Sequence, residues 1–131
     1  MKLQFITPTL HGVLDYAAAI ALILAPGLLN LQEDSVLVYW FSTIAGAGLI
    51  LYSLFTDYAL SLKGLISYRG HLILDSAASA SFILVAFIHE GTTLSMLYCL
   101  VMGLGVVGVI ALSGPAKEAP AQVSAQSAGQ P

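Results

Sequence analysis

The sequence has few charged residues, and this shortage excludes most classes of soluble protein. Only 8% of its 131 residues are charged, whereas 58% are hydrophobic, and the mean hydropathy is +0.90. A soluble domain carries roughly a quarter charged residues, so water is a poor solvent for this chain. The composition therefore predicts an integral membrane protein whose main partner is the lipid bilayer.

Basic runs, cysteine pairs and familiar catalytic motifs are also missing. Four Lys and Arg residues against seven Asp and Glu residues leave no basic patch that would bind nucleic acid. The single cysteine, Cys99, lies in an apolar run and has no partner for an internal disulfide. There is no phosphate-binding loop, CxxC, HExxH or credible Ser–His–Asp order. We therefore expect a non-enzymatic role.

Four apolar segments are each long enough to cross a bilayer. They lie at residues 8–28, 36–55, 68–88 and 93–112. A membrane span needs about 20 residues, and its backbone groups must be hydrogen-bonded within the segment, so all four are predicted to be helices. The fold class is therefore an all-α polytopic membrane protein, with a four-helix transmembrane bundle in residues 1–112. Residues 113–131, rich in Ala, Gln, Pro and Ser, are predicted to form a disordered cytoplasmic tail.

The distribution of charge predicts an orientation in the membrane. All cationic side chains flank the same side of the predicted spans, and they are Lys2, Lys63, Arg69 and Lys117. The two short connections on the other side are acidic and contain Glu33, Asp34 and Glu90. Because cytoplasmic segments carry an excess of Lys and Arg, we expect both termini and the middle connection to be cytoplasmic.

One unusual pattern occurs twice, sixty residues apart. In the stretches TPTLHGVLDYAAAIALIL and SYRGHLILDSAASASFIL, a histidine precedes an aspartate by four positions, giving His11 and Asp15, then His71 and Asp75. A Thr or Ser suited to capping a helix N-terminus stands four residues before each histidine. Matches between Ala and Leu mean little in an apolar chain, whereas matched His, Asp and capping residues indicate a repeated unit.

The second span of each unit carries matched glycines. They correspond at an offset of fifty-seven residues, Gly46 with Gly103 and Gly48 with Gly105. Because each unit contains an even number of spans, both units enter the membrane from the same side. We therefore predict two parallel two-helix repeats, about residues 7–55 and 67–112, related by a pseudo-two-fold axis along the membrane normal. Both His–Asp pairs then lie at the same depth, near the cytoplasmic end.

This organisation resembles a known family. A two-helix unit used twice, with Ala-Pro at the outer end of the first helix in LILAPGLL and glycines in the second helix, is similar to the SPW-repeat membrane proteins of bacteria. That family closes the first helix with Ser-Pro-Trp, where this chain has Ala-Pro-Gly at 25–27 and Val-Ala-Phe at 85–87. The resemblance covers about residues 7–112 and implies the four-helix architecture, without an activity or a functional residue.

The depth of the aspartates makes them costly. Asp15 lies roughly 12 Å along its helix from the cap, since each residue rises about 1.5 Å. An ionised carboxylate in the edge of the hydrocarbon costs on the order of 3 kcal/mol. Residues four apart share a helix face, so each aspartate can contact its own histidine. A protonated histidine, a hydroxyl, an ion or protonation of the carboxylate must offset the cost.

Several interpretations of the four residues stay open. In one, each pair is a structural clamp, in which the aspartate bonds its own histidine or the N-terminal N–H groups of the partner unit. The protein is then a scaffold or accessory subunit, as a homo-oligomer or with a membrane-protein partner. In another, His11, Asp15, His71 and Asp75 bind one metal ion, for which zinc, manganese and iron suit the ligand types.

Two further interpretations use the same histidines. His11 and His71 are placed to act as axial ligands of a haem between the first and third helices, or the pairs relay protons. A metal or a haem would give the protein a redox or ion-handling role. Asp57 in FTDY lies at the same end of the bundle, either as an interfacial residue near Lys63 or Arg69 or as a third acidic group of the site.

Overall fold

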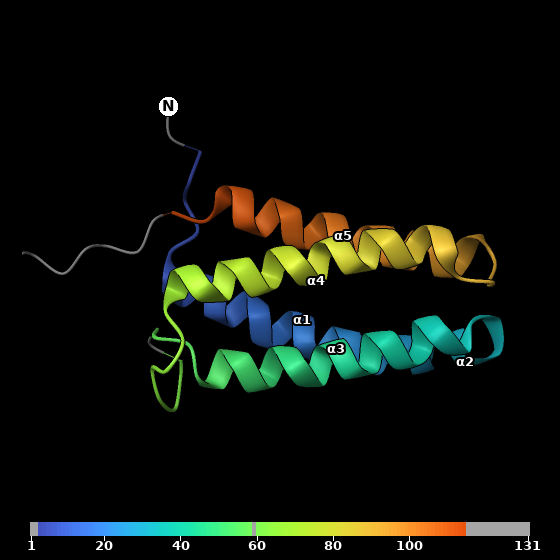
Figure 1. The fold of residues 1–131 in the computed structure, drawn as a ribbon, viewed down its shortest axis with the longest axis horizontal. Helices are drawn as coiled ribbons and strands as arrows, with labels where there is room; N and C mark the ends of the chain where they lie inside the picture. The colour runs from blue at the N-terminus through green and yellow to red at the C-terminus, as the bar shows by residue number, and fades with distance from the viewer. Residues whose placement is uncertain (1–2, 59, 115–131) are drawn as a thin grey trace, which may run out of the picture.

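The computed structural model describes residues 3–58 and 60–114, and the fold in these ranges is all-α. Four long helices lie side by side (Figure 1). They are α1 (Pro8–Leu28), α3 (Val36–Leu54), α4 (Tyr68–Ile88) and α5 (Thr93–Leu112), and a short helix α2 (Leu31–Asp34) joins α1 to α3. The four long helices are long and apolar enough to cross a membrane, with mean hydropathies of 1.5 to 2.3. The predicted all-α fold with four membrane-spanning helices is confirmed.

The helix boundaries follow from capping residues in the sequence. Thr7 Oγ1 accepts a hydrogen bond from the Leu10 N–H at 3.2 Å, and Ser67 Oγ accepts one from the Gly70 N–H at 3.0 Å. Three of the four spans match their predicted bounds, and α3 ends one residue earlier than predicted. Helix α2 lies where we expected only a polar connection, and it forms because Leu31 is fully buried. The predicted tail lies outside the described residues from residue 115 on.

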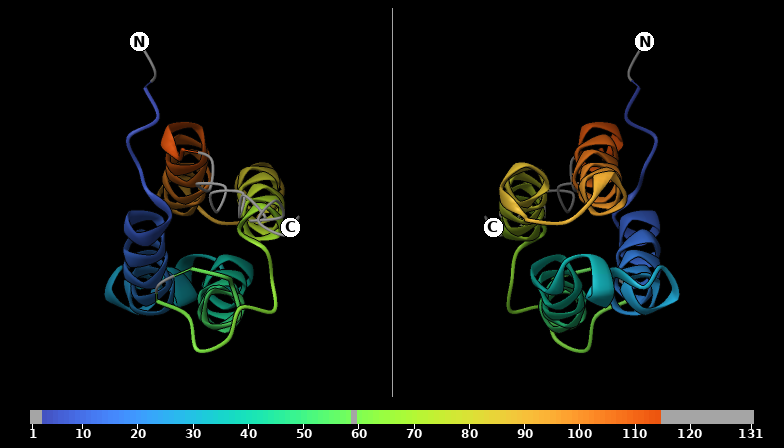
Figure 2. Two further views of the ribbon diagram at one scale, coloured as in Figure 1. Left: turned by 90° about the vertical axis from the view of Figure 1, so that its left-hand side faces the viewer. Right: turned by 90° about the vertical axis from the view of Figure 1, so that its right-hand side faces the viewer.

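The long helices pack as two hairpins, α1 with α3 and α4 with α5 (Figure 2). A glycine at the contact lets the two helices of each hairpin approach closely. A Cβ atom added at Gly46 would lie 2.8 Å from the Ala19 carbonyl oxygen, and one added at Gly103 would lie 3.0 Å from the Ser79 carbonyl oxygen. Close approach through small residues is the usual way for helices to pack in a membrane. Each hairpin is therefore a tightly packed unit.

The two hairpins contact each other at the end that carries α2, which we call the turn end. The hydroxyl oxygens of Ser42 and Tyr98 are 2.6 Å apart, and the rings of Phe41 and Phe82 lie edge to face with centroids 4.7 Å apart. Asp34 also links the two hairpins, because its carboxylate accepts hydrogen bonds from the Ser95 hydroxyl and from the Thr92 N–H.

These bonds predict a pH dependence at the turn end. The hydroxyl of Ser95, followed by the N–H of Thr92, lowers the pKa of Asp34 below its ordinary value. A lowered pKa in the folded state means that the ionised carboxylate stabilises the fold above the unfolded-state pKa of about 3.9, and that this stability is lost as the pH falls through the folded-state value.

We therefore expect Asp34→Asn to lower the melting temperature in detergent slightly at neutral pH, because bonds near the surface contribute little. The difference from the wild type should shrink as the pH falls below about 4 and disappear once the pH is below the lowered folded-state pKa. A difference that keeps its size in acid would contradict this role of the carboxylate.

At the opposite end, which we call the connection end, two short backbone pairings fix the chain. Ile6 pairs in parallel with Ser113, and Thr56 pairs in parallel with Ile66. The Ile6 N–H donates to the Leu112 carbonyl oxygen at 3.0 Å, and the Gly114 N–H donates to the Ile6 carbonyl oxygen at 2.9 Å. These pairings hold the residues that follow α3 and α5 against the starts of α4 and α1.

Candidate functional site

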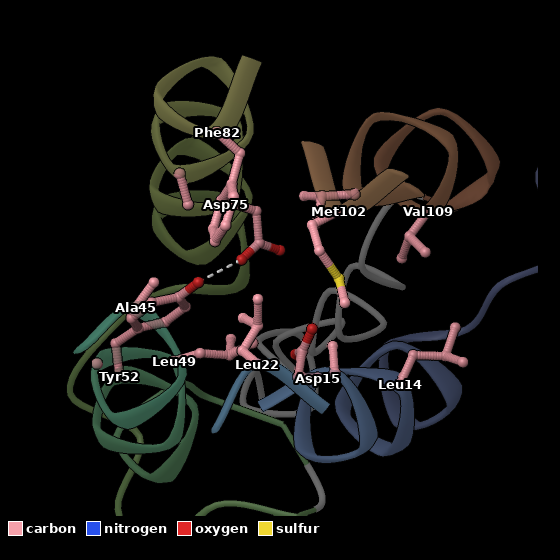
Figure 3. A pocket seen from close by; sticks show the side chains of 14 residues that line it. Leu14, Asp15, Leu22, Ala45, Leu49, Tyr52, Asp75, Phe82, Met102 and Val109 are labelled. Carbon is pink, nitrogen blue, oxygen red and sulfur yellow. Dashed lines mark hydrogen bonds between the residues drawn. The ribbon is translucent and has the colours of Figure 1, made fainter. Parts of the chain in front are cut away.

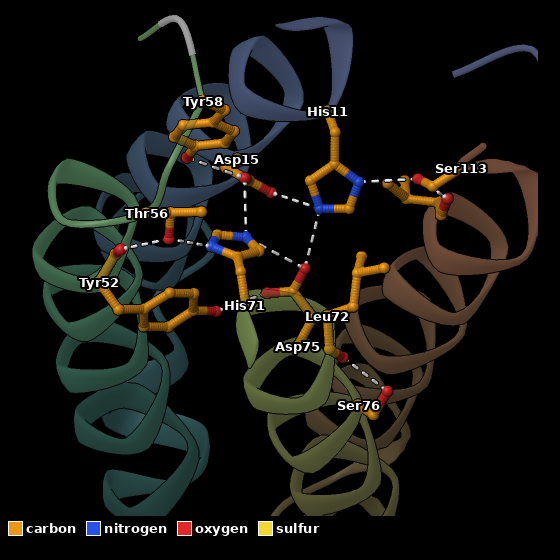
Figure 4. Close-up of polar contacts among 11 residues, drawn as sticks. His11, Asp15, Tyr52, Thr56, Tyr58, His71, Leu72, Asp75, Ser76 and Ser113 are labelled. Carbon is orange, nitrogen blue, oxygen red and sulfur yellow. Dashed lines mark hydrogen bonds and ion pairs between the residues drawn. The ribbon is translucent and has the colours of Figure 1, made fainter. Parts of the chain in front are cut away.

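The two His–Asp pairs meet at the connection end of the bundle. His11 and Asp15 extend from α1, and His71 and Asp75 extend from α4, toward a common point (Figure 4). Both histidines are fully buried, and the aspartates are 6% and 4% exposed. One nitrogen or oxygen from each residue lies within 4.8 Å of the others. We call these four side chains the His–Asp cluster.

The shortest contacts in the cluster cross from one hairpin to the other. His11 Nε2 is 2.9 Å from Asp75 Oδ2 but 3.4 Å from Asp15 Oδ1 on its own helix. His71 Nε2 is 2.9 Å from Asp15 Oδ2 but 3.3 Å from Asp75 Oδ2 on its own helix. Each aspartate thus lies nearer to the histidine of the other hairpin than to the histidine of its own helix. The cluster therefore joins the hairpins.

Hydroxyl groups fix the orientation of both histidine rings. Ser113 Oγ donates to the Val109 carbonyl oxygen at 2.7 Å, so it accepts a hydrogen bond from His11 Nδ1 at 2.8 Å. Thr56 Oγ1 donates to the carbonyl oxygen of Tyr52 at 2.6 Å, so it accepts one from Nδ1 of His71 at 2.7 Å. Both histidines therefore carry a proton on Nδ1, and both direct Nε2 toward the carboxylates.

Two tyrosines complete the surroundings of the carboxylates. The hydroxyl of Tyr52 donates to Asp75 Oδ1 at 2.7 Å, and the hydroxyl of Tyr58 donates to Asp15 Oδ2 at 3.2 Å. Burial raises the pKa of Tyr58, which lies in the connection after α3, so its hydroxyl keeps its proton. Each aspartate therefore has one neutral donor in addition to the histidines.

Apart from protonation of the carboxylates, the charge of the cluster can be balanced in two ways. Two buried carboxylates carry two negative charges, which either two protonated imidazoles or one divalent cation would neutralise. The Nε2 atom of His71 is buried and makes no hydrogen bond to any described residue, although Asp15 Oδ2 is only 2.9 Å away. The contact is close but poorly directed for an N–H donor, and buried nitrogens seldom lack a partner.

A haem does not fit between the two histidines. Bis-histidine ligation places the two ligating nitrogens on opposite faces of a wide macrocycle. Here Asp75 Oδ2 lies within 3.3 Å of Nε2 of both His11 and His71, so a carboxylate occupies the space that the macrocycle would need.

Asp57 is exposed and lies against Gly64 in the connection, apart from the four clustered side chains.

Four residues of the site were missed by the sequence analysis, namely Tyr52, Thr56, Tyr58 and Ser113. A signal for two of them was present. Thr56 and Ser113 are related by the same offset of fifty-seven residues that aligns the glycines, and each follows the second span of its predicted unit. The repeat itself stays a prediction, which these matched contacts support.

No protein-family model, curated protein or solved structure matches the chain.

Proposed function

We propose that this protein is a metal-binding membrane protein in which the His–Asp cluster holds one divalent transition-metal ion between the two hairpins. His11 and His71 would each contribute Nε2, and Asp15 and Asp75 would each contribute one carboxylate oxygen. The observation that carries this proposal is the inward direction of both Nε2 atoms, each fixed by a hydrogen bond from Nδ1 to a hydroxyl.

The surroundings of the cluster are those that metal sites commonly have. A ligating histidine almost always donates its other ring N–H to an acceptor, which fixes the ring orientation, and ligating carboxylates are themselves hydrogen-bonded. Ser113 and Thr56 serve the histidines in this way, and Tyr52 and Tyr58 serve the carboxylates. The unbonded Nε2 of His71 is then a lone pair directed at the ion.

The ligand set favours zinc, with manganese and iron as alternatives. Two imidazoles and two carboxylates suit these ions by type, and four protein ligands close a tetrahedral zinc site. The ion would balance both carboxylates and connect the hairpins at a depth where unpaired charge is unfavourable. The excess of Lys and Arg near this end supports a cytoplasmic location for the site.

The test is elemental analysis of the protein purified in detergent without chelator. We expect one atom of zinc, manganese or iron per chain, and loss of that metal in the double variant Asp15→Asn/Asp75→Asn, which keeps the side-chain shapes. The opposite result would be a wild type that contains no more metal than this variant and does not take up added zinc. That result would support a metal-free clamp of imidazolium–carboxylate pairs.

The hydroxyls that orient the histidines give a second prediction. Thr56→Val keeps the side-chain shape but leaves Nδ1 of His71 without an acceptor, and it should weaken zinc binding about 10–100-fold. Competition with a coloured chelator would measure the affinity. Ser76→Ala is the control, because the exposed hydroxyl of Ser76 donates to the Leu72 carbonyl oxygen of its own helix, away from the cluster. Equal affinities in the two variants would contradict the orienting role of Thr56.

A further inference from the structure

A cavity of about 230 Å³ lies between the two hairpins, beside the His–Asp cluster (Figure 3). All four long helices contribute to its lining, and most of that lining is apolar. The polar lining residues, Asp15, Asp75 and Tyr52, all lie at the end of the cavity nearest the connection end. The cavity is thus an apolar chamber with two carboxylates at one end.

The packing of the helices explains why this space is not filled. Each hairpin is tightly packed internally, and the hairpins contact each other through the turn end and through the cluster. Between these contacts the lining includes four small residues, which are Ala18, Ala45, Gly48 and Ala78. A Cβ atom added at Gly48 would meet nothing within 4 Å. Both ends hold the hairpins at a separation that these small side chains cannot bridge.

The polar atoms of the lining can only accept hydrogen bonds. The carboxylate of Asp75 accepts hydrogen bonds from His11 and from the Tyr52 hydroxyl, whose single proton is thereby used, and the carboxylate of Asp15 accepts one from the Tyr58 hydroxyl. A molecule in the cavity therefore has to bring its own donor. A neutral hydroxyl fits better than an ammonium group, because each carboxylate already has an imidazole 2.9 Å away and an added charge at this depth would be unfavourable.

The apolar walls favour a ring. Phe82 and Met102 face the cavity from α4 and α5 (Figure 3). Phenyl rings pack edge to face with other rings, and thioether sulfur makes favourable contacts with ring edges. We propose that the cavity binds a lipophilic phenol or hydroquinone from the bilayer, with its ring against Phe82 and Met102 and its hydroxyl donating to Asp15 or Asp75. This site goes beyond the proposed metal binding and does not depend on it.

The proposal can be tested with a matched pair of probes, para-octylphenol and its methyl ether. They have nearly the same shape, but only the phenol can donate a hydrogen bond. Native mass spectrometry of the wild-type protein from detergent should detect one phenol per chain. The affinity for the ether should be lower by a factor of about ten or more, because the ether cannot donate the hydrogen bond to the carboxylate. Equal binding of the two probes, or no saturable binding of the phenol, would overturn the proposal.

Two glycine variants locate the site. Gly48→Leu places a side chain into the cavity and should abolish phenol binding. Gly105→Leu is the control, because Gly105 is exposed on α5, lies outside the lining and also has open space around an added Cβ. Phenol binding that survives in Gly48→Leu, or that is lost equally in both variants, would refute the site. The metal content of the same samples should not change, so failure of this proposal is distinguishable from failure of the metal proposal.

Discussion

Replacing His71 by leucine is expected to lower the free energy of unfolding by about 3–5 kcal/mol, because it leaves a buried carboxylate without its partner. In the wild type, His71 Nε2 lies within 3.3 Å of oxygens from both Asp15 and Asp75. Without a metal ion, the variant would bury two carboxylates against a single imidazole; with one, it would lose a ligand of the ion. Reversible unfolding in mixed detergent, followed by circular dichroism, would measure the loss.

Two controls identify the cause of that loss. The double variant Asp15→Asn/His71→Leu removes one carboxylate together with the histidine and should recover part of the stability. His89→Leu removes a histidine outside the cluster, whose ring accepts a local hydrogen bond from the Gly91 N–H. If His89→Leu destabilised the protein as much as His71→Leu does, the cluster would not be what holds the hairpins together.

The second large effect is expected at a single added methyl group. Gly46→Ala should destabilise the protein by about 2–3 kcal/mol, the upper part of the range for overpacked interiors. The added Cβ would lie 2.8 Å from the Ala19 carbonyl oxygen, a backbone atom that can move away only if α1 and α3 separate. Melting temperature in detergent and the yield of folded protein would both report the change.

The same helix provides the control. Gly48→Ala adds the same methyl group two residues later, where nothing lies within 4 Å. It should be neutral or stabilising by up to about 1 kcal/mol, because alanine is the better helix former. Gly103→Ala should behave like Gly46→Ala, since its Cβ would lie 3.0 Å from the Ser79 carbonyl oxygen. Equal effects at positions 46 and 48 would contradict the close packing inferred for the hairpin.

The helices could be predicted from the sequence because their signals are local. Apolar length defines a span, and Thr7 and Ser67 mark where two of the helices begin. Helix α2 was not predicted, because four residues with two acidic side chains resemble a polar loop. Burial of Leu31 beneath them is a tertiary contact that no local pattern carries.

The site was predictable in its residue types but not in its connections. A repeated His–Asp pair inside an apolar helix indicated that the four residues matter, since each one is unfavourable there alone. The spacing of four suggested pairs within one helix, whereas the shortest contacts lie between helices. Ser113 was assigned to a disordered tail by composition, yet it is buried and bonds His11. Contacts that depend on how hairpins dock are not encoded in local spacing.

The parallel pairings at the connection end have a topological consequence. The pairing of Thr56 with Ile66 lies within the continuous chain that joins the two hairpins, whereas the pairing of Ile6 with Ser113 joins them only by hydrogen bonds. The start of α1 therefore lies beside the end of α5, and the path of the backbone is a ring with one break between them. In such a ring the order of the two hairpins along the chain is not fixed by the fold. The gap could be moved to the 56–66 connection, and a circular permutant would still bring both histidines and both aspartates to the same place.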